Sequence, residues 1–125
     1  MRACVCVLVF CTHHQLHCFT GRQQQHLDHV LAWARALAID PSLLLLDEPC
    51  SGLDDAESAL LGSLLRELAG EGRAVLIVEH DMDAVFAVAN VLTVMVNGNV
   101  LESGAPERIR SSRAVQEAYL GVEEE

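Results

Sequence analysis

Three uninterrupted apolar runs, separated by helical patterns, constrain the fold of this chain more than any other feature. They occupy residues 43–46, 74–78 and 91–96. None of them alternates polar and apolar residues, which is typical of strands buried on both faces, as in a parallel sheet covered by helices. We therefore predict three strands, each buried on both faces.

Segments with helical periodicity lie before and between these runs. Residues 27–38 repeat apolar side chains at helical spacing until Pro41 ends the pattern. Residues 56–69 form an amphipathic pattern with a leucine stripe, and residues 82–89 form a shorter one. The order of strands and helices predicts an α/β domain with a mostly parallel sheet flanked by helices.

The last third of the chain predicts a hairpin and two short helices. Asn97-Gly98 between apolar residues is a tight-turn signal, so the third strand is expected to fold back. Pro106 can begin a helical turn at residues 107–110, and residues 113–120 read as a final helix. Residues 122–125 form an acidic tail.

The first 22 residues differ in composition from the rest of the chain. We predict that residues 23–121 form one domain. They contain no acid and four of the five cysteines, and they are rich in histidine. This crowding is either a zinc or copper site or an accident of composition, and it motivates the hypothesis of a frameshifted or misassigned start. Cys50 stands apart and is either a packed small side chain or a reactive thiol.

The charged residues exclude several functions. All eight basic residues of this 125-residue chain are arginines, against eighteen acids, and the net charge is −10. Without lysine the chain cannot form a Schiff base or complete a GxxxxGK[ST] phosphate-binding loop. The acidic balance argues against a nucleic-acid partner. The apolar start is much shorter than the roughly 20 residues of a membrane span, so we expect no direct membrane insertion.

Three chemically capable residues follow the first two apolar runs. Asp47 and Glu48 end the first run, and His80 follows the second. Because the carboxyl ends of parallel strands meet at one edge of a sheet, we expect these side chains to converge. An aspartate there can hold Mg²⁺, a glutamate can orient or deprotonate water, and an imidazole can donate to a phosphate oxygen. The alternatives are an acid pair in a turn and a structural histidine.

Three motifs resemble those of an ABC-transporter ATPase. Residues 43–49 (LLLLDEP) resemble its Walker B motif, residues 51–54 (SGLD) its D-loop and residues 78–82 (VEHDM) its H-loop. They occur in the family's order and spacing, within a resemblance that covers about residues 27–121. The C-terminal sequence is similar to the end of the ATPases of branched-chain amino-acid importers and their amide and urea relatives.

The resemblance implies a partial P-loop NTPase-like domain that uses ATP and Mg²⁺. By resemblance, Asp47 is the metal position, Glu48 the catalytic base, His80 the γ-phosphate switch and Asp54 a D-loop contact to nucleotide. It also implies two partners: a second ATPase subunit and membrane permease subunits. The expected location is cytoplasmic, peripheral to the inner face of the cell membrane.

The family's signature motif is represented by a weak match. Residues 19–23 can be aligned with LSGGQ, which makes Thr20, Gly21 and Gln23 the candidate cofactor contacts. Arg22 stands where the family has a glycine that lets backbone approach phosphate closely. Aligning the following helix instead moves the signature to residues 23–27, so either four residues are inserted or the motif is lost.

The resemblance favours a truncated ATP-binding and ATP-hydrolysing subunit of an ABC importer, of the branched-chain amino-acid type, which energises transmembrane transport. Nothing in the sequence matches the family's Walker A motif, so we predict no appreciable ATPase activity for the chain alone. Two alternatives remain open. One is a catalytically inactive fragment that acts only as a binding partner of an intact ATPase, and the other is a non-functional gene remnant.

Overall fold

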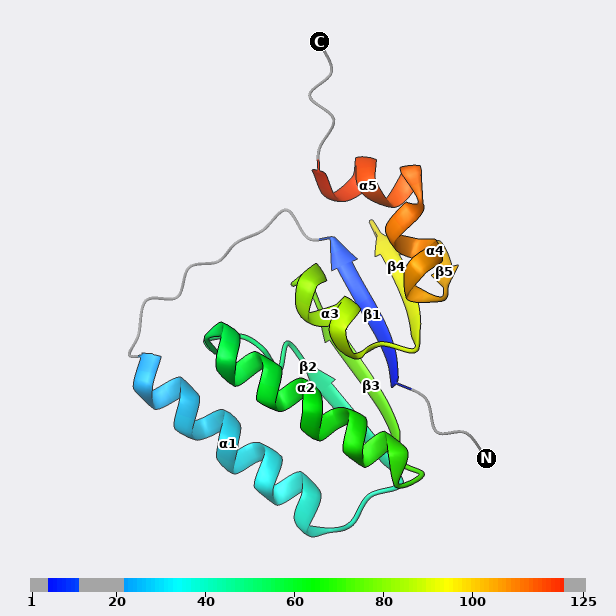
Figure 1. Cartoon of the computed structure of the whole chain (residues 1–125). Coiled ribbons are helices and arrows are strands. Elements are labelled where there is room, and N and C mark those ends of the chain that lie inside the picture. Colours follow the sequence, from blue (N-terminus) through cyan, green and yellow to red (C-terminus); the bar gives the residue numbers. More distant parts are fainter. Residues whose placement is uncertain (1–4, 12–21, 121–125) are drawn as a thin grey trace.

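A five-stranded, mostly parallel sheet organises the computed structural model of this chain (Figure 1), which describes residues 5–11 and 22–120 and the side chains of residues 30–119. The strand order is β2-β3-β1-β4-β5, and only the β4–β5 pair is antiparallel. This arrangement confirms the predicted α/β class. The strands are β1 Val5–Cys11, β2 Leu43–Asp47, β3 Ala74–Glu79, β4 Val91–Val96 and β5 Asn99–Gly104.

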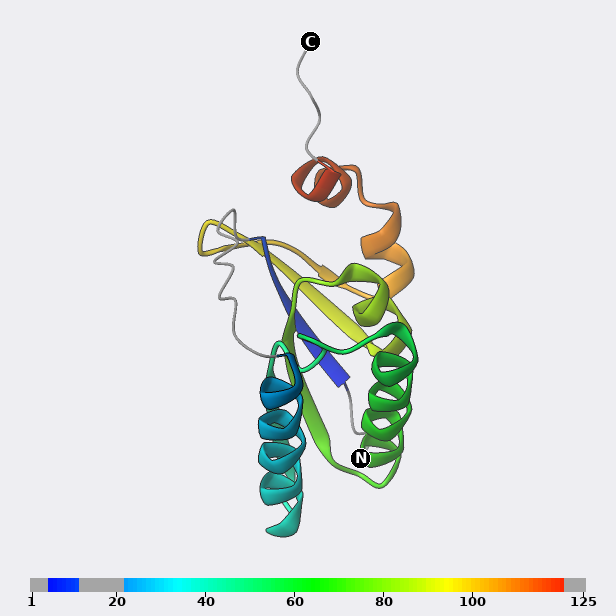
Figure 2. The same ribbon diagram turned by 90° about the vertical axis from the view of Figure 1, so that its left-hand side faces the viewer.

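All the helices expected from the sequence are present. Asp54 caps the start of α2, and the chain leaves this helix through Gly72, whose φ of 96° favours glycine. α1 lies beside α2 at the β2 edge of the sheet, and α3 packs against α2 (Figures 1 and 2). The helices are α1 Arg22–Ala38, α2 Asp55–Gly70, α3 Met82–Val88, α4 Pro106–Ser111 and α5 Arg113–Leu120.

The central strand β1 was not predicted. It pairs in parallel with β3 on one side and with β4 on the other. Its sequence is an unbroken apolar run like the other three, so the signal was present, but the sequence prediction considered the run only as a membrane span. The division at residue 22 remains a prediction, although residues 5–11 share one sheet with the later strands.

The hydrophobic core lies between one face of the sheet and α2. Leu44 of β2 and Val75 and Ile77 of β3 point toward this helix, whose Leu61 and Leu65 are buried against them. Three members of the leucine stripe of α2 are therefore core, whereas its Leu60 is 72% exposed and its Leu64 is 37% exposed. The core continues through Leu68, Val85, Leu92, Val94, Ile109 and Val115.

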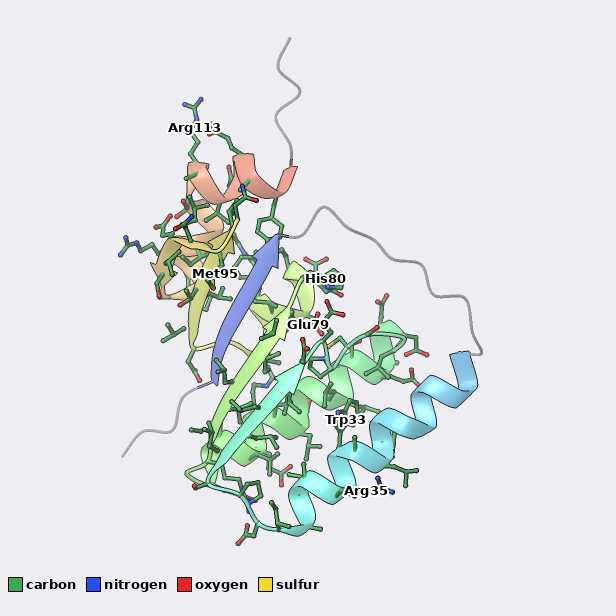
Figure 3. All side chains as sticks on the ribbon, turned by 180° about the vertical axis from the view of Figure 1, so that it is seen from behind. Trp33, Arg35, Glu79, His80, Met95 and Arg113 are labelled. Atoms are coloured by element: carbon green, nitrogen blue, oxygen red, sulfur yellow. The ribbon has the colours of Figure 1, made fainter. Side chains whose placement is uncertain are left out.

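The opposite face of β2 is uncovered, which corrects the prediction that this strand is buried on both faces. Leu43 is 53% exposed and Leu45 is 63% exposed. Figure 3 views the sheet from this side, and none of the described helices lies over β2 and β3 there. An apolar run indicates two covered faces, but it does not indicate whether the covering layer belongs to the same segment of chain.

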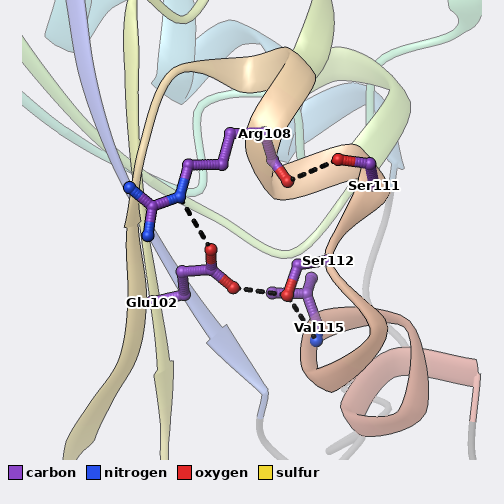
Figure 4. Close-up of polar contacts among 5 residues, drawn as sticks. All are labelled: Glu102, Arg108, Ser111, Ser112 and Val115. Carbon is purple, nitrogen blue, oxygen red and sulfur yellow. Dashed lines mark hydrogen bonds and ion pairs between the residues drawn. The ribbon is translucent and has the colours of Figure 1, made fainter.

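The C-terminal elements are held to the sheet by the predicted hairpin and by a polar cluster. Asn97 and Gly98 both have positive φ, 50° and 77°, as a two-residue type I′ turn requires. Glu102 of β5 accepts hydrogen bonds from Arg108 Nε of α4 and from the Ser112 hydroxyl, which lower its pKa, the serine contributing most (Figure 4). Ser112 Oγ in turn accepts from the Val115 N–H at 3.4 Å.

Candidate functional site at the carboxyl ends of β2 and β3

The predicted residues Asp47, Glu48 and His80 line one open groove of about 490 Å³. Asp47 ends β2 and pairs in register with Val78 of β3, and His80 follows the end of β3. Leu45, Leu76 and Val78 of the uncovered apolar face line the groove, and Leu46 and Glu79, which also contact the core side, complete its lining. The structure therefore brings the three residues together, while their chemical roles remain predictions.

Glu48 is held in an uncommon backbone conformation. Its φ is +47°, in the left-handed region that costs a non-glycine residue roughly 1–2 kcal/mol. Its N–H donates to the Val78 carbonyl at 2.7 Å, and its own carbonyl accepts from the Ser51 N–H at 3.1 Å. Pro49, which follows it, is fully buried. Strained residues of this kind concentrate at functional sites, where the surrounding structure fixes them.

His80 and Glu48 face each other across the groove. His80 Nδ1 lies 3.4 Å from Glu48 Oε1, and the side chains are 63% and 53% exposed. At this exposure the contact between His80 and Glu48 contributes little to stability. It matters because it places the candidate base, Glu48, beside the candidate hydrogen-bond donor to phosphate, His80. Asp81 caps α3 directly after His80, accepting from the Asp83 and Ala84 N–H groups.

Glu79 is a residue of this site that sequence reasoning missed. It is the last residue of β3, only 4% exposed, and its side chain extends toward α2 (Figure 3). Its Oε1 accepts from the Cys50 N–H at 2.8 Å, and its Oε2 accepts from the His80 N–H at 3.2 Å. The sequence held one signal for this role: Glu79 directly follows a run of apolar residues that predicts a buried strand. An acid at the end of such a strand needs hydrogen-bond partners if it is buried.

Cys50 is a packing residue whose thiol is poorly reactive. It packs against the core beside the loop that follows β2. Burial, followed by the nearby negative charge of Glu79, raises the pKa of the thiol from its usual 9.0 to about 11. Because the thiolate is the reactive form, a raised pKa suppresses reaction at neutral pH. The structure thus supports the packed interpretation of Cys50.

We expect alkylation of Cys50 to be slow in the folded protein. A pKa about two units above 9.0 lowers the thiolate fraction roughly 100-fold at pH 8. Iodoacetamide labelling at pH 8, read at the peptide that contains Cys50 by mass spectrometry, should be slower by about that factor in buffer than in 8 M urea. Equal rates in the two conditions would contradict the burial of this thiol.

The donor set of the groove fits a magnesium ion. Asp47 supplies a carboxylate at an exposed strand end, and Glu48 lies beside it. Mg²⁺ requires oxygen ligands and commonly keeps several waters while using one or two carboxylates. Asp47 would therefore hold the ion. When bound, the ion would supply charge neutralisation for phosphate oxygens.

The described residues do not provide a binding site for the phosphate chain of ATP. His80 is the only described side chain of the groove that can carry a positive charge. Arg66 and Arg73 are not among its lining residues: Arg66 donates to the Ala87 carbonyl, and Arg73, at the amino end of β3, contacts Asp40 and Glu71. Phosphate binding needs backbone N–H groups at a helix start or a lysine, and none of the groove's described residues supplies these.

Asp54, the predicted D-loop contact, is not among the residues that line the groove. Asp54 forms a capping box with Glu57: its carboxylate accepts from the Glu57 N–H at 2.8 Å, and its own N–H donates to Glu57 Oε2 at 3.0 Å. Its structural role is therefore to start α2. Thr20 and Gly21 lie outside the described residues, as do the side chains of the N-terminal cysteines and histidines. Gln23 is in the first turn of α1, with its side chain not described.

Solved structures with the same arrangement of strands and helices are ATP-binding cassettes. The ADP conformation of MJ1267, an ATP-binding cassette of an ABC transporter, superposes with a TM-score of 0.68 at 28% identity, over 82% of this chain and 41% of that one. A dimeric bacterial ABC transporter cassette, MJ0796, superposes with a TM-score of 0.60 at 29% identity, over 70% and 36% of the two chains. The chain is therefore homologous to the C-terminal part of the ATP-binding domain of ABC transporters.

Sequence relatives of the chain include ATP-binding proteins of both import and export systems. The chain is 38% identical over 89 residues to the high-affinity branched-chain amino acid transport ATP-binding protein LivG of Escherichia coli, covering 70% of this chain and 35% of LivG. It is also 31% identical over 105 residues to the lipopolysaccharide export system ATP-binding protein LptB of Acidithiobacillus ferridurans, covering 84% and 42%. The family described as branched-chain amino acid ATP-binding cassette transporter matches residues 99–125.

The chain spans only about a third of the length of the LivG relative. It carries the two motif-bearing strands β2 and β3 and the C-terminal hairpin and helices that the family match covers in part. No described helix is both long and apolar enough to cross a membrane.

Proposed function

We propose that this chain supplies the C-terminal half of an ATP-hydrolysing site in an ABC transporter. In this role Asp47 holds Mg²⁺, Glu48 orients or deprotonates the attacking water, and His80 donates to the γ-phosphate. The convergence of these three residues in one groove is the observation that carries the proposal. The phosphate-binding loop has to come from the part of the domain that the matched region does not include.

The uncovered face of β2 supports the proposal that another part of the domain supplies the phosphate-binding loop. Leu43 and Leu45 expose apolar surface directly beside the groove, where a parallel sheet ordinarily carries a second helical layer. A covering layer whose helix begins at the Asp47 edge would bring unpaired backbone N–H groups to the groove. We propose that one further segment of such a domain would both cover the face that the described helices leave open and bring phosphate-binding groups to the groove.

We further propose that the transporter is an importer of the branched-chain amino-acid type. The support comes from the match over residues 99–125, which include β5, α4 and α5, and from the likeness to LivG. The likeness to the export protein LptB shows that the strands and the groove alone do not separate transport directions. The C-terminal segment therefore carries the argument for the substrate class.

A second ATPase subunit and membrane permease subunits are the proposed partners, and the cytoplasmic face of the membrane is the proposed location. The dimeric cassette structure supports an assembly of two such domains. The exposed position of the groove also leaves it accessible to a second domain. A site that closes only on assembly would exclude water from the reacting groups.

A chimaera tests the proposed function. Residues 27–120 of this chain would replace the C-terminal segment of LivG that they match, so that LivG provides the phosphate-binding part. We expect the purified chimaera to hydrolyse ATP in a magnesium-dependent reaction, whereas the 125-residue chain alone should show no hydrolysis above the buffer blank. A folded chimaera that binds ATP without hydrolysing it would refute the proposal.

A further inference from the structure

We propose that Glu79 is a positioning residue that fixes Glu48 and His80 relative to each other. Its carboxylate connects the two loops that carry them: one oxygen accepts from the Cys50 N–H and the other from the His80 N–H. Cys50 lies two residues after Glu48, across the buried Pro49. This inference rests on the proposed function for its catalytic consequence, but its geometric content can be tested without any reaction.

A carboxylate is the side chain that this position requires. Both partners are N–H donors, and an ionised carboxylate offers acceptors only, on two oxygens. A glutamine could satisfy one donor, but its NH₂ group would then face the other. A hydrophobic side chain of similar size would satisfy neither.

Glu79 is deeply buried. At 4% exposure it lines one small pocket together with Ile77 and the α2 side chains Leu61 and Leu65. An apolar side chain there would leave the Cys50 and His80 N–H groups without their acceptor, which destabilises the structure whatever the role of Glu79. A positioning role predicts in addition that turnover falls while substrate binding is kept, which a purely structural role does not predict.

The first test measures amide hydrogen exchange in the full chain by NMR. Glu79→Met should speed exchange at both the Cys50 and the His80 amides by about tenfold or more, and Glu79→Gln at one of them. The matched control is Glu102→Gln, which removes a carboxylate that also accepts two hydrogen bonds but lies in β5. It should leave both amides unchanged. If Glu79→Gln does not fold, the methionine variant decides the question.

The second test separates positioning from the proposed function. In the LivG chimaera, Glu79→Met should lower kcat for ATP about tenfold or more while KM changes less than about twofold, because the Glu79 carboxylate is buried and bonded to two backbone N–H groups and would act through Glu48 and His80. A chimaera that is inactive even with Glu79 intact counts against the proposed function, while the exchange data still decide the role of Glu79. Equal protection of both amides in the parent and in Glu79→Met would overturn the inference.

Discussion

Glu48→Gln should lower the ATPase rate of the LivG chimaera by at least about 100-fold, since a positioned general base contributes roughly 10²–10⁴-fold. Glutamine keeps the size and backbone bonding of Glu48 but cannot accept a proton from the attacking water. Affinity for ATP should change little, because the substitution leaves Asp47 and the phosphate-binding part intact. Turnover with radiolabelled ATP, together with equilibrium binding of a fluorescent analogue, measures both quantities.

The control for this substitution is Glu107→Gln. Glu107 is an exposed acid in α4, far along the chain from the groove, and its replacement removes the same charge. The control should keep the parent ATPase rate. If Glu48→Gln retained more than about a tenth of the parent rate, Glu48 would not be the base, and the acid pair would have to be interpreted as a structural turn.

Leu92→Ala should destabilise the chain by about 2–5 kcal/mol. Leu92 lies in β4 with none of its surface accessible, and truncation would leave a cavity in the centre of the core. Urea denaturation followed by the fluorescence of Trp33, the single tryptophan, reports the change because Trp33 packs against the core. The unfolding slope should stay constant if the variant changes stability alone.

Leu60→Ala is the matched control for this measurement. The same chemical change is made on α2, but Leu60 is 72% exposed, so the expected loss is within about 0.5 kcal/mol. Equal losses at the two positions would mean that β4 is not at the centre of the core. A large loss at Leu60 alone would mean that another element covers this side of α2.

Much of the fold was predictable because local signals agree with the global arrangement. The apolar runs became β2, β3 and β4, and the helical periodicity became α1 to α3, although α1 begins at Arg22 rather than at residue 27. The hairpin was predictable from Asn97-Gly98, since both residues can take positive φ. β1 was missed because its apolar run was considered only as a membrane span.

The residues of the candidate site were predictable, but the hydrogen bonds that hold them in place were not. Asp47, Glu48 and His80 could be named because strand ends collect at one edge of a parallel sheet. Glu79 could not be assigned a role, because its two hydrogen-bond partners lie 29 residues and one residue away in the sequence. Asp54 was predicted as a nucleotide contact, and the structure adds its capping bonds to Glu57, which lies three residues later.

The sequence by itself determined the α/β class, the identity of the groove residues and the lack of a lysine for phosphate binding. Those properties depend on residue type, period and order along the chain. Only the tertiary structure decided that β1 lies at the centre of the sheet, that no described helix covers the face beside Leu45 and that the buried Glu79 carboxylate links the Cys50 and His80 backbone N–H groups. These depend on which distant segments meet, and no local pattern encodes that because pairing and burial are properties of the assembled layers.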